Sequence, residues 1–394
     1  MSEETSTSNS QLASRLNPVN MPVRYWLGTI GLLIAAVLPM FLSATWALTF
    51  ASAYFFGIYA MSWDVVSGYT GQISFGHGLF FAVGGYTSAL LNLGYGIQPL
   101  LSIPVGVLLA AVAGVLIGVP ALRLRGPYLS LVTLVAPLML TSFFVWQSGI
   151  FGGELGLSSP DTLFGLSTLF DTTLIYYIAF GLFVFVLALL LLLTRTDAGA
   201  VLTAIREDED AVAAAGLNAA KFKIMAFILS AAVGGLAGAV IVHTGRAGVN
   251  PTDLMSIVIN VEVIIAAILG GMGTITGAAL GGIMLILLRE QLNNMGSSIT
   301  ELVGVQTDIP VLGDPISDIS FLIFAVITLF LLFALPGGVI RWAVGIGGMI
   351  KERILGESEP EVAADGGRKT PARQVYENYT EQLKEITGGD DDER

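Results

Sequence analysis

Two acidic residues lie within long apolar stretches of this sequence. Asp64 follows Trp63, and Glu262 stands between Val261 and Val263. Placing an ionisable group inside a membrane costs at least ~2.5 kcal/mol, so such a residue is a functional candidate by default. The alternative is that each carboxylate is structural and fully hydrogen-bonded, as most buried polar groups are. We favour the structural interpretation for both.

A second cluster combines glycine with neutral polar side chains. Gly71 and the glycines on either side of it interrupt a helical pattern, and Gln72, Ser74 and His77 lie beside them. Irregular backbone at membrane depth is tolerated only where protein or a water-filled cavity satisfies it, and broken helices often form substrate sites. With Glu262, these residues are our candidates for a translocation pathway. The alternative, close helix packing around small residues with polar groups serving the backbone, stays open.

Motifs for catalysis, nucleotide binding and metal binding are missing from the sequence. It has no G-x-x-x-x-G-K-[ST], H-E-x-x-H or G-x-S-x-G element. The two histidines, His77 and His243, lack the i, i+4 spacing of a helical metal site, and there is no cysteine. We therefore expect no enzyme activity, cofactor or metal, and no basic patch suggests nucleic acid. Any ATP hydrolysis that drives the protein must come from another chain.

The composition predicts an integral membrane protein. Hydrophobic residues form 54% of the 394 positions and charged residues 12%, whereas a soluble domain has about a quarter charged residues. Since a helical span needs about 20 apolar residues, we predict an all-α, polytopic membrane helix bundle of about ten transmembrane helices. The expected spans are 26–43, 46–66, 72–93, 99–120, 127–146, 172–194, 222–244, 254–271, 275–289 and 318–336.

Charge distribution predicts the topology. If both termini are cytoplasmic, every Lys and Arg except Arg246 and Arg289 falls on the cytoplasmic side, as the positive-inside rule requires. This gives a disordered N-terminal tail (1–25), a transmembrane domain (26–341) and an acidic cytoplasmic tail (342–394) in a multi-pass protein of the cell membrane. The net charge of −12 suggests a halophilic source, and an ordinary disordered acidic tail is the alternative.

One soluble segment, residues 195–223, is too charged to span. It predicts a short amphipathic helix that ends at Gly216, followed by a second helix that Asn218 caps. Such a helix can fit a groove on a partner, or it can lie on the membrane surface between two spans. The residues expected on its apolar face are Val201, Ala204, Ile205, Val212 and Ala215.

Four blocks of the sequence resemble one transporter family. DAVAAAG (210–216) resembles the E-A-A-x-x-x-G loop of ABC importer permeases, with Asp for the usual Glu. SGYTGQISFGHGLFFAVGGYTSALL (67–91), LRLRGPYLSLVTL (122–134) and NVEVIIAAILGGMGTITGAALGGIMLIL (260–287) resemble the branched-chain amino-acid (LIV-type) permeases, in particular their M-type subunit. The blocks follow the order of that family.

The resemblance implies a function and a set of partners. The chain would be the permease subunit of an ATP-driven importer for branched-chain amino acids, with urea or short amides as alternative cargo. Its partners would be ATP-binding cassette subunits, a second homologous permease, an extracytoplasmic solute-binding protein and membrane lipid. An ion-coupled secondary transporter is the alternative from another class. The residues that would form a coupling helix against the ATPase are Arg206, Glu209, Asp210, Ala211 and Gly216.

Overall fold

The computed structural model describes residues 23–121, 127–166, 171–245 and 248–303, with short pieces between 325 and 346. Within these ranges the chain is helical, and its only β-type pairing is the isolated bridge between Leu157 and Val249. The longer helices are α2 (Val23–Val37), α3 (Ala44–Thr70), α4 (Gly78–Tyr95), α5 (Pro99–Ala121), α6 (Pro127–Trp146), α8 (Thr172–Thr194), α9 (Asp197–Glu207), α11 (Ala219–Val242), α13 (Ile257–Gly270) and α14 (Ile275–Val303). The short helices are η2 (Leu38–Met40), α7 (Ser148–Phe151), η3 (Leu163–Gly165), α10 (Glu209–Ala214) and α12 (Pro251–Met255).

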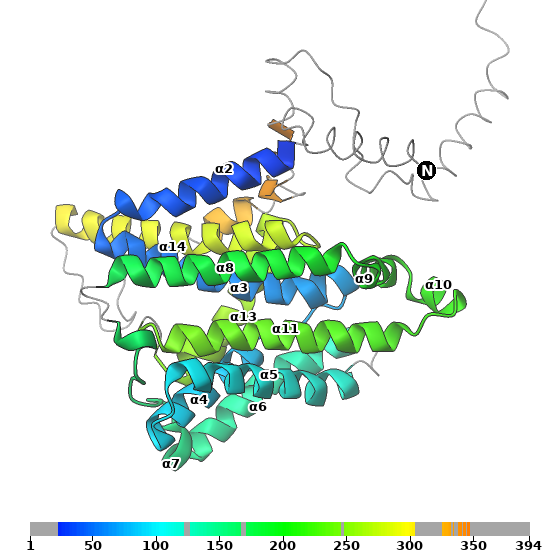
Figure 1. Cartoon of the computed structure of the whole chain (residues 1–394), viewed down its shortest axis with the longest axis horizontal. Coiled ribbons are helices and arrows are strands. Elements are labelled where there is room, and N and C mark those ends of the chain that lie inside the picture. Colours follow the sequence, from blue (N-terminus) through cyan, green and yellow to red (C-terminus); the bar gives the residue numbers. More distant parts are fainter. Residues whose placement is uncertain are drawn as a thin grey trace, which may run out of the picture. The chain divides into compact units, whose positions relative to one another are not determined.

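Helix α3 lies at the centre of the unit formed by Trp26–Ala343. Every residue from Gly57 to Gly68 is buried, and a helix buried on all sides must lie inside a bundle. Helices α8, α11, α13 and α14 pack around it, and α11 also packs on α4 and α5 (Figure 1). The core therefore follows α3 and α11.

The helices bear out the prediction of an all-α, polytopic membrane bundle. By length and composition, six described segments can cross a membrane. Helices α5, α6 and α8 match the spans expected at 99–120, 127–146 and 172–194. Helices α3 and α4 fall outside those six, and the tenth expected span lies largely outside the described residues. The count of ten therefore stays a prediction, as do the two tails at 1–25 and 342–394, which are almost wholly outside the described residues.

Several expected boundaries were wrong, each for a local reason. Helix α2 ends at Val37, before a 3₁₀ turn that contains Pro39, because proline has no N–H to continue the helix. The span expected at 254–271 is two helices, since Ser256 breaks the chain and its hydroxyl accepts a hydrogen bond from Ile259. Helix α14 continues well past the expected end at 289.

Small residues bring α13 and α14 into close contact. A Cβ atom at Gly277 would lie 2.6 Å from the Gly271 carbonyl oxygen, and one at Gly281 would lie 2.8 Å from the Gly270 nitrogen. Both distances are too short for real atoms. The G-x-x-x-G spacing of these two glycines therefore forms a helix-packing face.

Candidate functional site

The charged segment after α8 folds as two short helices rather than the single helix expected. Thr196 caps α9, and its hydroxyl accepts a hydrogen bond from Gly199. Asp208 then adopts an extended conformation (φ −158°, ψ 103°), and its carboxylate accepts a 2.9 Å hydrogen bond from the Ala211 nitrogen. This residue therefore ends α9 and caps α10.

The C-terminal end of α10 confirms the prediction that the amphipathic segment ends at Gly216. Gly216 has φ +81°, its nitrogen donates to the Ala213 carbonyl, and the Leu217 nitrogen donates back to the Val212 carbonyl. These two bonds form a Schellman motif, which favours glycine at the left-handed position. Asn218 accepts a hydrogen bond from Lys221 and caps α11, as expected.

The apolar face of this segment differs in part from the prediction. Ile205 and Val212 are buried and pack with Ala219, but Ala204 and Ala215 are exposed. The break at Asp208 accounts for Ala215, because one helical period cannot run through an extended residue. Ala204 lies before the break, within α9, whose buried face is formed by Gly199, Leu202 and Ile205.

The five residues expected at an ATPase contact divide into two groups. Asp210, Ala211 and Gly216 are exposed on or beside α10, which lies beyond α9 at the end of the segment (Figure 1). Arg206 and Glu209 are exposed as well, but their side chains also make contacts within the chain. The structure thus presents a small, exposed helix end with side chains short enough for close approach by another protein.

Glu209 fastens α10 to the bundle. Its carboxylate forms a 2.6 Å ion pair with the ammonium group of Lys223 on α11. The Lys223 side chain is 7% exposed and that of Glu209 is 47% exposed. Because a nearly buried ammonium needs a partner, this pair fixes where α10 sits on α11.

Arg206 fastens α9 to the end of α3. Its Nη1 atom donates a 3.1 Å hydrogen bond to the Gly68 carbonyl, while Nη2 forms a 2.8 Å ion pair with Glu207. Asp64, also on α3, accepts a 2.7 Å hydrogen bond from the Gly273 nitrogen in the turn between α13 and α14. We call this end of the bundle, where Gly68, Arg206 and Gly273 meet, the coupling end.

The chain breaks after α3 at Gly71, which has φ +71°. Helix α4 starts only at Gly78, so the third span expected at 72–93 begins six residues too early. Gly68 and Gly76, which were expected to interrupt the helix pattern with Gly71, do not end α3. Gly68 lies inside that helix, and Gly76 packs against the carbonyl group of Thr133.

Side chains from neighbouring helices satisfy the non-helical backbone between α3 and α4. The Phe75 nitrogen donates to the Thr133 hydroxyl (3.2 Å), and Ser130 donates to the Ile73 carbonyl (2.7 Å). The Gly78 nitrogen donates to the amide oxygen of Asn260 on α13 (2.7 Å). Irregular backbone at this depth thus receives its hydrogen bonds from protein. Asn260 is a site residue that the sequence analysis did not single out.

The polar candidates in this break have different surroundings. Ser74 and His77 are buried, and His77 Nε2 lies 2.7 Å from the hydroxyl of Ser230 on α11. Gly71 is exposed, and Gln72 is partly exposed. The Gln72 Oε1 atom has no hydrogen-bond partner among the described residues. The structure therefore brings four of the pathway candidates together on one segment.

Glu262, the fifth pathway candidate, lies elsewhere. Its carboxylate is 3.2 Å from Nη1 of Arg289 on α14, and their side chains are 5% and 52% exposed. The sequence analysis expected a polar partner but did not identify Arg289, because 27 residues separate the two along the chain.

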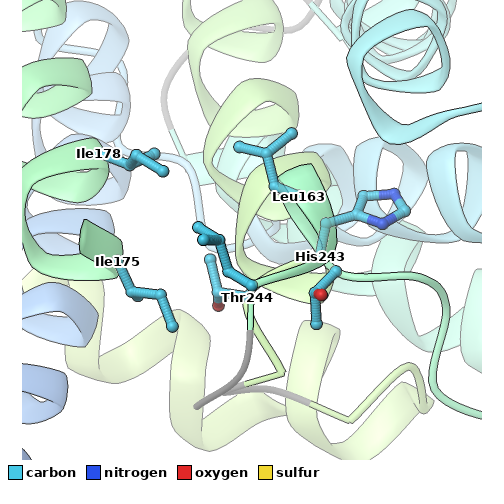
Figure 2. A pocket seen from close by; sticks show the side chains of 7 residues that line it. Leu163, Ile175, Ile178, His243 and Thr244 are labelled. Carbon is cyan, nitrogen blue, oxygen red and sulfur yellow. The ribbon is translucent and has the colours of Figure 1, made fainter. Parts of the chain in front are cut away.

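At the opposite end of the bundle, a crevice lies between η3, α8 and the end of α11 (Figure 2). None of the five pathway candidates lines it. His243 borders it, but the ring nitrogens of His243 contact Ser88 (2.8 Å) and the Asp161 carbonyl (2.6 Å). The residues that line the crevice are Thr162, Leu163, Leu166, Ile175, Ile178, His243 and Thr244.

Comparison with known proteins gives a consistent result. Residues 45–331 match the family described as branched-chain amino acid transport system / permease component. The chain is 35% identical over 259 residues to the high-affinity branched-chain amino acid transport system permease protein LivM of Escherichia coli (strain K12), which covers 59% of this chain and 60% of that protein. It is 26% identical over 340 residues to the probable branched-chain amino acid transport permease protein LivM of Methanocaldococcus jannaschii, covering 76% and 95%. No solved structure matches the chain.

A bundle of long apolar helices with a charged segment at one end defines a multi-pass membrane protein. The family match covers most of this bundle and all four sequence blocks noted above. The chain therefore belongs to the family of branched-chain amino-acid transport permease components. It spans about 60% of the length of its relatives from Escherichia coli and Salmonella typhimurium.

Proposed function

We propose that this chain is the membrane permease subunit of an ATP-driven importer of branched-chain amino acids. It works with ATP-binding cassette subunits, a second homologous permease and an extracytoplasmic solute-binding protein. The exposed helix α10, with its Gly216 exit, carries this proposal, because a short exposed helix is suited to a groove on a partner protein. The chain has no phosphate-binding motif of its own.

The contacts within the segment support this role for α10. Glu209 and Arg206 hold the segment against α11 and α3, so a force applied to α10 reaches the transmembrane helices directly. Asp210, Ala211 and Gly216 remain exposed for the ATPase. We therefore assign the contact with the ATPase to these three residues, and an anchoring role to Arg206 and Glu209.

For the solute pathway, we favour Gln72 among the candidates. Its side chain is partly exposed, and its amide oxygen, which is itself buried, has no hydrogen-bond partner among the described residues. Ser74 and His77 are wholly buried; the Nε2 atom of His77 is hydrogen-bonded to Ser230, while its Nδ1 atom has no partner among the described residues. A pathway needs weak contacts that release the solute, and a neutral amide suits that requirement. The largely exposed, apolar faces of α5 and α6 suit contact with lipid or with the second permease.

The test is transport by the reconstituted complex. The chain is co-purified with the ATPase subunits, second permease and binding protein of the proposed complex. The complex is then placed in proteoliposomes with ATP inside or outside. We expect uptake of labelled leucine, isoleucine and valine only when ATP faces the ATPase subunits. Urea and acetamide serve as competing cargo. Uptake that follows an ion gradient without the ATPase subunits would contradict the proposal and favour a secondary transporter.

A further inference from the structure

Three glycines at the coupling end leave a space that Arg206 occupies. We call the space between Gly68, Gly71 and Gly273 the glycine notch. A Cβ atom at Gly71 would lie 3.1 Å from Cγ of Arg206, and one at Gly273 would overlap its Nη1 atom. The notch thus joins the end of α3 to the turn between α13 and α14, with the Arg206 side chain lying between them.

The guanidinium is held from two directions. Nη1 donates to the Gly68 carbonyl at 3.1 Å. On the other side, Nε and Nη2 donate to the Glu207 carboxylate at 3.1 and 2.8 Å. A planar guanidinium presents five N–H donors in a fixed fork that reaches both partners, whereas the donors of a lysine ammonium all radiate from one compact group. The side chain is 32% exposed, so part of it remains in contact with solvent.

Asp64 links the same elements from inside the bundle. Its fully buried carboxylate accepts the 2.7 Å hydrogen bond from the Gly273 nitrogen. A Cβ atom at Gly68 would overlap Asp64 and lie 2.6 Å from the Gly273 nitrogen. Hydrogen bonds therefore run from α9 through Arg206 to α3, and from α3 through Asp64 to the α13–α14 turn.

We propose that Arg206 is a positioning residue that transmits movement of residues 195–223, the coupling segment, to α3 and to the α13–α14 turn. This inference deepens the proposed function and rests on it. Helix α3 packs on α8, α11, α13 and α14, so displacing its end moves the centre of the bundle. Close-packed interiors transmit such displacements because they deform little. In this role Arg206 acts on α3 and the α13–α14 turn within the chain, whereas α10 makes the contact with the ATPase.

The test separates ATP hydrolysis from transport. In the reconstituted complex, Arg206→Gln removes the positive charge and the forked set of guanidinium N–H donors. Helix α10 keeps its Asp208 cap, its Gly216 exit and its ion pair with Lys223. We expect the ATPase subunits to co-purify as with wild type and to hydrolyse ATP at a similar rate. Leucine uptake per ATP hydrolysed should fall about tenfold, a loss within the usual range of coupling between sites.

Two further variants make the test specific. Arg206→Lys keeps a cation and one hydrogen bond, so uptake per ATP should fall by about threefold. Lys221→Gln removes the same charge from an exposed position nearby on α11 and should leave the ratio unchanged. If the Arg206→Gln permease itself does not fold and cannot be purified, the comparison of Arg206→Lys with Lys221→Gln decides the question.

Two results would overturn the proposal. One is wild-type uptake per ATP in the assembled Arg206 variants. The other is loss of ATPase co-purification in Arg206→Gln, which would place Arg206 at the ATPase contact. Absence of ATP-dependent uptake in the wild-type complex is a different result, because it would contradict the proposed function itself.

Discussion

At the residue scale, the two partners of the ion pair between Glu262 and Arg289 differ in their exposure to solvent. The Glu262 side chain is 5% exposed, whereas that of Arg289 is 52% exposed. A long arginine side chain can keep its charged end in water while its stem packs on the protein. A buried carboxylate has no such option and depends on its partner. The two residues should therefore respond differently to substitution.

We expect Arg289→Ala to destabilise the purified protein more than Glu262→Gln. Arg289→Ala leaves the Glu262 carboxylate buried without its cation, at a cost of ~1–3 kcal/mol, whereas Glu262→Gln leaves an arginine that can reach water. The measurement is the Tm of each detergent-purified variant, with Arg289→Lys as the control that keeps a cation. Equal losses of Tm in both variants would contradict this account.

The same variants address transport. If Glu262 is structural, Glu262→Gln should assemble and retain most of its uptake, because the amide keeps the shape and a hydrogen-bond acceptor. A Glu262→Gln complex that assembles fully but carries no solute would instead show that the charge itself serves transport.

At the element scale, the coupling segment shows how far sequence reasoning reached. Gly216 and Asn218 were assigned correctly because helix exits and caps depend on residues close in sequence. The break at Asp208 had a local signal too, because an Asp followed by Glu209 and Asp210 is typical of a helix start. That signal was missed because the apolar residues on both sides of Asp208 were assigned to one continuous helix.

Contacts between distant residues could not be predicted in the same way. The amide of Asn260 satisfies the Gly78 nitrogen 182 residues away, and no local pattern points from one to the other. The glycine-rich break after α3 was visible in the sequence, but which side chains satisfy its backbone depends on tertiary packing. The sequence alone could therefore not decide whether its polar residues serve the backbone or a solute.

Gly216 offers an element-scale test of the coupling segment. A Cβ atom there would meet nothing within 4 Å, yet the residue has φ +81°. Any effect of substitution must therefore come from the backbone conformation rather than from a clash. Gly216→Val should unwind the exit of α10, because a β-branched residue is strained at positive φ. We expect the folded protein to persist with little change in Tm, while uptake driven by ATP is lost.

The matched control is Gly216→Asn, since asparagine tolerates the left-handed conformation. Uptake should be largely retained in this variant, and both proteins should be compared at equal amounts of assembled complex. Wild-type uptake in Gly216→Val, with normal ATPase association, would show that the α10 exit does not contribute to coupling.

At the scale of the whole molecule, two sets of loops gather at opposite ends of the bundle. The coupling end joins Gly68, Arg206 and Gly273. At the other end, Asn92 and His243 both contact Asp161, and Leu157 pairs with Val249. The first set comes from loops expected inside the cell and the second from loops expected outside. This agreement supports the predicted grouping of the connections at two ends. Which end faces the cytoplasm stays a prediction, as does the halophilic origin suggested by the net charge.

Cysteine labelling tests which end faces the cytoplasm. The chain has no cysteine, so each introduced thiol reports on one site. Ser158 and Ala200 are both exposed, but they lie in loops assigned to opposite sides by the distribution of Lys and Arg. In intact cells, an impermeant maleimide should label Ser158→Cys and leave Ala200→Cys unlabelled until the membrane is opened. Gly313→Cys should behave like Ser158→Cys, and Ser358→Cys like Ala200→Cys. Labelling of Ala200→Cys from outside would place the coupling segment away from the ATPase and contradict the proposed function together with the topology.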